Sequence, residues 1–238
     1  MKRFDLRKVY ETLYSAFGPQ GWWPVTCASA AKRDSDEARF EIMIGAVLTQ
    51  NTAWTNVERA IDCLRKEKLL SVRALSRAPL AKIKACVRSA GYYNQKARYV
   101  KALARYLEKN YDGDLEKFFS QPPGSLRREL LSLRGVGPET ADSILLYAGG
   151  KRFFVVDAYT RRVFARYGIL NGGEDYDTVR ALFEANLARD EKIYGEFHAL
   201  LVELAKRCCF KREPNCAACP LAAKCESARA ITNFKIQP

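Results

Sequence analysis

The sequence has no apolar stretch near the roughly 20 residues that a membrane-spanning helix needs. It also has no internal repeat and no low-complexity tract. The N-terminal segment "MKRFDLRKVYETLYSAFG" interleaves apolar and charged residues as an amphipathic helix does, and it lacks the apolar centre of a signal peptide. We therefore expect a cytoplasmic protein, associated with the nucleoid if it binds DNA, with no membrane partner.

Acidic residues are few relative to basic ones. The chain has 40 Lys and Arg against 27 Asp and Glu, a formal net charge of +13. A surplus of this size, spread along the chain, implies a polyanionic partner, and nucleic acid fits better than a membrane surface. With 238 residues, 48% of them hydrophobic, the chain is long enough for one large domain or two smaller ones with real cores.

Strand patterns are almost absent, since the run "FFVV" at 153–156 is short and isolated. Ser35 and Asn94 are expected to cap helices and Pro79 to open one, and glycines follow the expected helix ends at Gly91, Gly149 and Gly168. Apolar residues recur at helical spacing over 4–17, 36–50, 54–66, 79–89, 94–109, 125–133, 138–148, 158–167, 176–188 and 191–207. The sequence predicts an all-α protein with a distinct C-terminal tail.

The segment "LRGVGPETADS" at 133–143 places a glycine turn between two of these helices. Gly135 and Gly137 suit a tight turn that no larger residue could follow. Pro138 suits the first turn of the next helix, where its missing N–H costs nothing. Glu139 follows it, and an acid is favourable there because of the helix dipole. Taken alone, the turn fits an ordinary connection between two helices equally well.

Cysteines give the strongest chemical signal. Cys209, Cys216, Cys219 and Cys225 have the spacing C-x6-C-x2-C-x5-C, and Pro220 follows the third. Four thiolates from one short loop suit an iron–sulfur cluster or a tetrahedral zinc ion, and the spacing alone does not separate the two. A disulfide framework is not expected in an intracellular chain of this size. The other cysteines follow no ligand spacing and are expected to be small buried hydrophobes: Cys27, Cys63, Cys86 and Cys208.

The cysteine spacing is similar to the [4Fe–4S] loop of the endonuclease III family of DNA repair glycosylases. "LRGVGPETA" resembles the helix-hairpin-helix of that family, and "VVDAYTRR" (155–162) resembles its aspartate segment; "GAVLTQNT" and "GYYNQKA" also have counterparts. The resemblance covers residues 36–226 and implies an all-α, two-domain helix-hairpin-helix glycosylase fold around a DNA-binding cleft. A six-helix domain (31–150) would contain the hairpin, and a second domain (1–30 and 151–238) would end in the cluster loop.

The resemblance also implies roles for single residues. Gly135, Val136 and Gly137 would offer backbone N–H groups to a DNA phosphate without reading the base sequence. Asp157 matches the catalytic aspartate, which would stabilise positive charge developing on the sugar and orient a water molecule, although it also suits an ordinary N-cap. Glu139 stands where bifunctional members carry the lysine that forms a Schiff base. A glycosylase without lysine-type lyase activity is therefore implied.

The tryptophans bear on the base that is removed. "WWP" (Trp22, Trp23 and Pro24), the segment that leads to Trp54, and "YYNQKA" closely resemble the 3-methyladenine DNA glycosylase branch, which also has an acid at the position of Glu139. In that branch the matching aromatic residues sandwich an extruded alkylated purine. Such a base is cationic and stacks well on electron-rich rings. The alternative is that these aromatic residues are ordinary members of the hydrophobic core. This chain departs from the branch in retaining a complete cluster loop.

Gln50 and Tyr92 or Tyr93 would fill the gap left by the flipped base. His198, the only histidine, lies on an apolar helix face and is expected to be structural. The expected partner is double-stranded DNA with damaged bases, bound by a monomer. Three functions remain open. The first is a monofunctional glycosylase for alkylated purines such as 3-methyladenine. The others are a glycosylase for oxidised or mismatched pyrimidines and a catalytically inactive DNA-binding or redox iron–sulfur protein.

Overall fold

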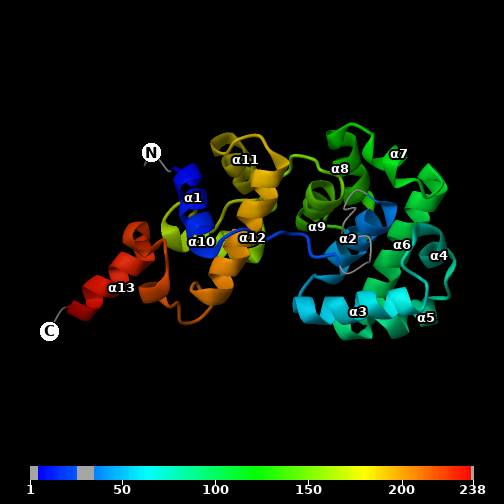
Figure 1. Cartoon of the computed structure of the whole chain (residues 1–238), viewed down its shortest axis with the longest axis horizontal. Helices are drawn as coiled ribbons and strands as arrows, with labels where there is room; N and C mark the ends of the chain where they lie inside the picture. The colour runs from blue at the N-terminus through cyan, green and yellow to red at the C-terminus, as the bar shows by residue number, and fades with distance from the viewer. Residues whose placement is uncertain (1–4, 26–34, 237–238) are drawn as a thin grey trace. The chain divides into compact units, whose positions relative to one another are not determined.

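The computed structural model describes residues 5–25 and 35–236, and the regular elements in these ranges are all helices (Figure 1). The predicted all-α class is confirmed. The chain divides into two compact units. We call residues 1–22 with 152–238 the terminal unit and residues 23–151 the central unit, and each is described by itself.

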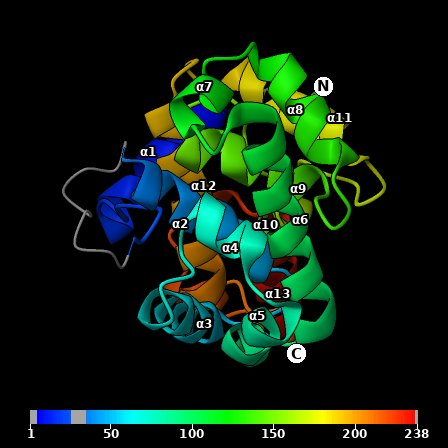
Figure 2. The ribbon, with the colours of Figure 1, turned by 90° about the vertical axis from the view of Figure 1, so that its right-hand side faces the viewer.

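The central unit is built around α2 (Asp36–Leu48), which is buried at every position from Phe40 to Leu48. A helix that is apolar on all sides needs partners on all sides. In this unit α2 packs against α3, α6, α7, α9 and η3 (Figure 2). The other elements are α3 (Trp54–Lys66), α4 (Val72–Arg77), α5 (Leu80–Cys86), η2 (Val87–Ala90), α6 (Tyr93–Tyr111), α7 (Leu115–Phe119), α8 (Pro123–Ser132), α9 (Pro138–Ser143) and the π-helical turn η3 (Ile144–Ala148).

The terminal unit has α12 (Glu191–Arg207) at its centre, packed against α1 and α10. Its core is aromatic: Phe154 and Phe183 stack with ring centroids 4.3 Å apart, and Phe164 and Phe197 meet them at steep angles. The other elements are α1 (Leu6–Phe17), α10 (Ala158–Tyr167), α11 (Tyr176–Asn186), η4 (Cys216–Ala218), η5 (Ala222–Lys224) and α13 (Glu226–Ile236).

The predicted helix ends have mixed outcomes. Ser35 caps α2 through Ala38 N–H, Pro79 precedes α5, and glycines follow the predicted helix ends at Gly91, Gly149 and Gly168. Asn94 as a cap is wrong, because α6 already begins at Tyr93 and its N-cap is Tyr92 in the left-handed region. The helices α4, α7 and α13 were not predicted. The first two are too short to show a helical period, and α13 lies in the segment expected to be a tail.

The cysteines outside the loop pattern also divide. Cys86 and Cys208 are buried as expected, whereas Cys63 is partly exposed, and Cys27 lies outside the described residues. Among the described helices, none combines the length and the apolar character needed to cross a bilayer.

Candidate active site and nucleic-acid interface

Asp157 is the N-cap of α10, and its side chain is buried in the terminal unit. Oδ1 accepts a hydrogen bond of 2.6 Å from the backbone N–H of Thr160. Oδ2 lies 3.5 Å from Nε2 of His198 on α12. The carboxylate is therefore held from both sides, by the start of its own helix and by an imidazole from the central helix of the unit.

The pKa of Asp157 is set by opposing effects. Burial raises the pKa, because it disfavours the charged form, but the imidazole of His198 and the bonds to Thr160 lower it by more. The net pKa lies below the ordinary value of a carboxyl group. The structure thus keeps an ionised carboxylate in a buried site, where charge interacts strongly with its surroundings.

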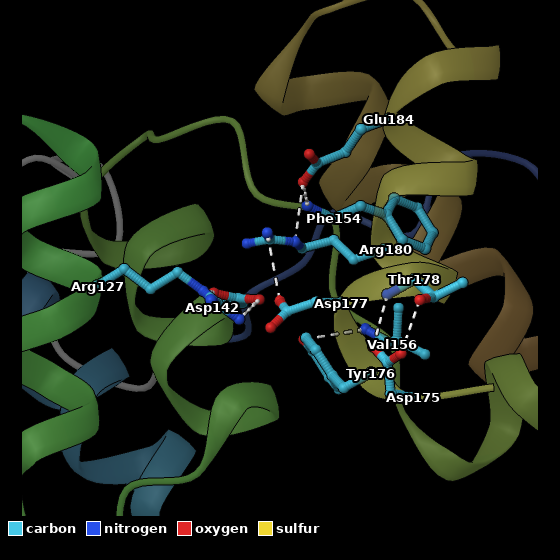
Figure 3. A network of polar contacts seen from close by, with 10 residues as sticks. All are labelled: Arg127, Asp142, Phe154, Val156, Asp175, Tyr176, Asp177, Thr178, Arg180 and Glu184. Atoms are coloured by element: carbon cyan, nitrogen blue, oxygen red, sulfur yellow. Dashed lines mark hydrogen bonds and ion pairs between the residues drawn. The ribbon is translucent and has the colours of Figure 1, made fainter.

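The segment before Asp157 is extended, and its backbone is anchored to α11 by side chains (Figure 3). Phe154 N–H donates to Glu184 at 2.9 Å, and Val156 N–H donates to the hydroxyl of Tyr176 at 3.3 Å. Arg180 extends this network, since it pairs with Glu184 and with the nearby Asp177. The strand-like run therefore has no strand partner in the described residues, and α11 replaces one. Sequence reasoning missed these positioning side chains.

His198 is buried and does more than fill the core. It faces Asp157, and the ring of Trp22 meets its imidazole edge-on, with centroids 5.6 Å apart. His198 and Asp157 are far apart in the sequence, so no spacing in the sequence predicts this contact. The terminal unit thus brings together one residue predicted for catalysis, one predicted for base stacking and one expected to be only structural.

The remaining predicted stacking residues lie in the central unit. Trp23 is only 6% exposed; it meets Trp54 edge-on at 5.3 Å and lies 5.3 Å from the ring of Tyr147. Trp54, the first residue of α3, is half-buried, as is Pro24. Trp23 is a core residue of this unit, which agrees with the alternative prediction that the tryptophans belong to the hydrophobic core. Trp54 keeps an accessible surface.

The glycine turn joins α8 to α9. Gly135 has φ +89, and a Cβ there would overlap the ring of Tyr99, so the steric prediction is confirmed at this position. It is wrong at Gly137, which has an ordinary φ of −91 and open space around it. Val136 between them is buried. No side chain caps α9 at Gly137, so the reason for this glycine is not steric strain within the chain.

The two helices of the hairpin are clamped together by a buried ion pair (Figure 3). Arg127 on α8 donates from Nε to Asp142 on α9 at 2.7 Å and from a second nitrogen at 3.3 Å, and Asp142 is fully buried. Two parallel bonds fix orientation as well as distance. Glu139 lies on the exposed side of the first turn of α9, and its backbone carbonyl accepts from Ser143 at 2.7 Å.

Gln50 lies in the turn after α2, and its amide donates to Gly135 O at 2.8 Å and to Thr140 at 3.0 Å. The turn is also held from inside by Lys96, whose buried ammonium donates to the carbonyls of Leu48, Gln50 and Ala90 at 2.6–2.8 Å. Burial lowers the pKa of Lys96 to about 8. This lysine was not singled out from the sequence, and it ties the predicted DNA-contacting turn to the start of α6.

Tyr92 and Tyr93 differ sharply. Tyr92 is 68% exposed and occupies the left-handed region at φ 44, which is costly for a residue with a large side chain. Tyr93 is half-buried, and the guanidinium of Arg88 lies 5.9 Å from its ring centre. Three residues were predicted to fill the gap that the flipped base leaves in the DNA duplex. Of these, Tyr92 is the most exposed, whereas the side chain of Gln50 is already hydrogen-bonded within the protein.

Cys209, Cys216, Cys219 and Cys225 line one cavity of the terminal unit. Cys209 lies just after α12, Cys216 and Cys219 lie at the two ends of η4, and Cys225 follows η5. Arg166 reaches into the same cavity and donates to the sulfur of Cys209 at 3.3 Å. Burial raises the pKa of Cys219 to about 11, so in this arrangement the thiol form is favoured.

In residues 5–25 and 35–236, no three His, Cys, Asp or Glu side chains are placed closely enough to hold a metal ion. The four sulfurs share a cavity without forming a preset ligand cage. Cys208, which lies outside the spacing pattern, is buried and lines the same cavity, and its thiol donates to Ala218 O.

An all-α fold with a glycine turn between two helices and a net charge of +13 suits a protein that binds a polyanion. Residues 44–189 match the model of the HhH-GPD superfamily of base excision DNA repair proteins. A Methanocaldococcus jannaschii protein named as a DNA repair glycosylase is 43% identical over 222 residues, which are 92% of this chain and 95% of that one. The chain belongs to the HhH-GPD superfamily, and within it to the endonuclease III-like DNA glycosylases.

Two solved structures give the same fold. The Helicobacter pylori 3-methyladenine DNA glycosylase MagIII, bound to 1,N6-ethenoadenine, is 27% identical with a TM-score of 0.68, over 86% of this chain and 98% of that one. An endonuclease III–DNA complex is 23% identical with a TM-score of 0.76, over 96% of this chain and 97% of that one. The predicted helix-hairpin-helix glycosylase fold is confirmed.

Proposed function

We propose that this DNA glycosylase hydrolyses the N-glycosidic bond of alkylated purines, 3-methyladenine foremost, and that it cleaves no DNA strand. The observation that carries the proposal is the buried, ionised carboxylate of Asp157, held by Thr160 and His198. A carboxylate in such surroundings is suited to stabilise the positive charge that develops on the sugar as the base leaves.

The reaction requires one further reactant, a water molecule, which Asp157 can orient for attack on the sugar. The sugar–nitrogen bond breaks, its electron pair leaves with the base, and the water oxygen forms the new bond to the sugar. The water loses one proton in this step, which passes by way of the Asp157 carboxylate to the solvent. Because a methylated purine carries a positive charge, it leaves as a neutral base without protonation by a general acid. His198 is placed to keep Asp157 ionised and fixed in direction.

Glu139 supports hydrolysis by water over a covalent route. A lysine in the first turn of α9 could form an imine with the sugar carbon, whereas the carboxylate of Glu139 cannot. The expected product is therefore an intact strand with an abasic site.

Aromatic residues support an alkylated purine as the substrate. A cation stacked on an electron-rich ring gains roughly 1–2 kcal/mol beyond the area it buries when the site is desolvated. Trp54 and Trp22 are the half-buried tryptophans, and Trp23 supports Trp54 from the core. The likeness to the H. pylori 3-methyladenine glycosylase, solved with a modified adenine, agrees with this substrate class.

The test of the substrate compares two tryptophan variants. Trp54→Ala is expected to lower the rate of 3-methyladenine release about tenfold, while binding to an abasic-site analogue changes less than twofold, because no base remains there to stack. Trp23→Phe is the control, since it acts on the core, and it should lower the melting temperature more than it changes substrate preference. Equal losses of release and abasic-site binding in Trp54→Ala would make Trp54 a structural residue.

DNA would be engaged through the hairpin and through Tyr92. With no side chain capping α9 and open space at Gly137, the backbone N–H groups there can approach a phosphate, aided by the helix dipole. Tyr92 is exposed, and it lies two residues after Ala90, whose carbonyl accepts a hydrogen bond from the buried Lys96. Tyr92 is therefore suited to fill the gap left by the extruded base.

We also propose that Cys209, Cys216, Cys219 and Cys225 hold a [4Fe–4S] cluster. The donor set fits, since four thiols line one cavity and Arg166 can stabilise negative charge on sulfur. The cluster would supply iron–thiolate bonds that order this loop.

Purified protein should contain about four irons per chain, as a single such cluster requires. Cys219→Ser should lose the iron, whereas Cys208→Ser, a matched change at the buried neighbour outside the pattern, should keep it. A protein with one zinc, or equal iron loss in both variants, would contradict the assignment.

A further inference from the structure

An open groove of about 620 Å³ runs along α6 in the central unit. Its lining includes four cations from that one helix, Arg98, Lys101, Arg105 and Lys109. These positions are three or four residues apart, so they form one row on the helix surface. The feature was not apparent as a motif in the sequence, and neither the hairpin nor the aspartate site makes use of it.

The lining of the groove contains no carboxylate. Of the acids close by, Glu129 accepts from the hydroxyls of Tyr106 and Tyr111, and Glu108 pairs with Arg77. Among the described residues, none of the four cations of the row forms an ion pair with a carboxylate. A basic protein always has positive surface, but four like charges in a row within a groove repel one another unless an anion lies among them.

The middle of the row is fixed in place. Lys101 donates to the carbonyl of Ala78, and Arg105 Nε donates to Ser76 O at 3.4 Å. Carbonyl acceptors orient these groups without cancelling their charge. Burial lowers the pKa of Lys101, because it disfavours the charged form, and the neighbouring charge of Arg105 lowers it further.

The groove is linked to the hairpin at one end. Leu133, which directly follows α8, lines the groove together with Leu80 and Tyr106. Tyr99, beside Arg98 on α6, lies against Gly135. A polyanion that reaches the hairpin turn could therefore continue along α6 from the same end.

We propose that this groove binds the phosphodiester backbone of the duplex arm that flanks the lesion, as a second phosphate-binding track beside the hairpin. From Arg98 to Lys109 the helix rises about 16 Å, at about 1.5 Å per residue. A row of this length can face several successive phosphates of one strand. The proposal is independent of which base the enzyme removes.

The test uses the two exposed ends of the row, since Lys101 and Arg105 also hold the groove wall. Arg98→Gln with Lys109→Gln is compared with Arg59→Gln with Arg73→Gln, which removes two exposed cations outside the groove. Binding of full-length protein to a 30-base-pair duplex with a central abasic-site analogue is measured between 50 and 200 mM salt. Duplexes shortened on one side or the other show which arm is bound. Circular dichroism melting confirms that both variants fold.

The groove variant should lower the slope of log K against log salt by about 1.8, because each phosphate contact contributes about 0.9. Across this fourfold salt range, wild type should thus lose about 12-fold more affinity than the variant. The difference should vanish when one particular arm is shortened. An unchanged slope, a slope change equal to that of the control variant, or a difference that survives shortening of either arm would overturn the proposal.

Discussion

The helices α9 and α10 begin in opposite ways. At α10 the chain supplies its own anion, since Asp157 caps the first turn and is buried beside His198. At α9 no side chain caps the first turn, and Gly137 leaves space in front of it. The first backbone N–H groups of any helix need an acceptor from outside the helix. The same requirement can thus hold the carboxylate that we propose as catalytic at one helix, and at the other leave a place for the DNA phosphate that we propose to bind there.

The largest effect is expected when the anion at the start of α10 is neutralised. Asp157→Asn keeps the size of the cap and some of its capping ability but removes the charge, so base excision should fall on the order of a hundredfold or more. Affinity for DNA with an abasic-site analogue should be nearly unchanged. Both are measured by single-turnover release and by equilibrium binding.

Asp175 offers a matched control. It caps α11 in the same way, accepting from Thr178 N–H at 2.8 Å, but it is exposed. Asp175→Asn should therefore leave excision within about twofold of wild type. Similar losses in the two variants would show that Asp157 acts only as a cap.

A second variant tests why the anion at α10 stays ionised. His198→Phe keeps a ring against Trp22 and removes the nitrogen beside Asp157, so the pKa of Asp157 should rise. The acidic limb of the excision rate should then move to higher pH, with little change near neutrality.

The lowered pKa of Asp157 also determines how the stability of the fold depends on pH. A carboxyl with a lowered pKa stabilises the fold above its ordinary value and loses this contribution as pH falls through the lowered value. Acid unfolding of His198→Phe should therefore begin at higher pH than that of wild type. If His198→Phe instead lowers the excision rate by the same factor at every pH, His198 acts only as a packing residue.

The smallest effects are expected at the start of α9. Gly137→Ala places a methyl group before α9, and it should weaken duplex binding a few-fold while changing the free energy of unfolding by less than about 1 kcal/mol. Gly135→Ala should do the reverse, since a Cβ would meet Tyr99, and should cost about 1–3 kcal/mol of stability. Binding and urea unfolding of both variants separate the two. Unchanged duplex binding in Gly137→Ala would show that this turn does not contact a DNA phosphate.

Local features of the fold could be predicted from the sequence because they depend on residues close together in the chain. The cap at Ser35, the glycine turn at 135 and the helical periods are of this kind. Short helices such as α4 (Val72–Arg77) offer too few residues for a period to appear. The helix α13 (Glu226–Ile236) follows the last cysteine and lies in the tail, where no helix was predicted.

The surroundings of Asp157 could not be predicted from the sequence. Its contact with His198, and the anchoring of Phe154 by Glu184, join segments that come together only when the terminal unit folds. His198 gave a signal only as a polar residue on an apolar helix face, which fits a structural role equally well. The row of cations on α6 was likewise hidden in an overall basic composition, and only the groove distinguishes it.

The central claim is that the enzyme releases an alkylated purine by hydrolysis and leaves the strand intact. The direct measurement incubates methylated DNA with excess enzyme, separates the released bases, and follows strand breaks before and after alkali, with borohydride present in a parallel sample. The account predicts release of 3-methyladenine ahead of thymine glycol, strand breaks only after alkali, and no trapped protein–DNA adduct. Preferred release of thymine glycol, strand breaks without alkali, or efficient trapping would contradict it.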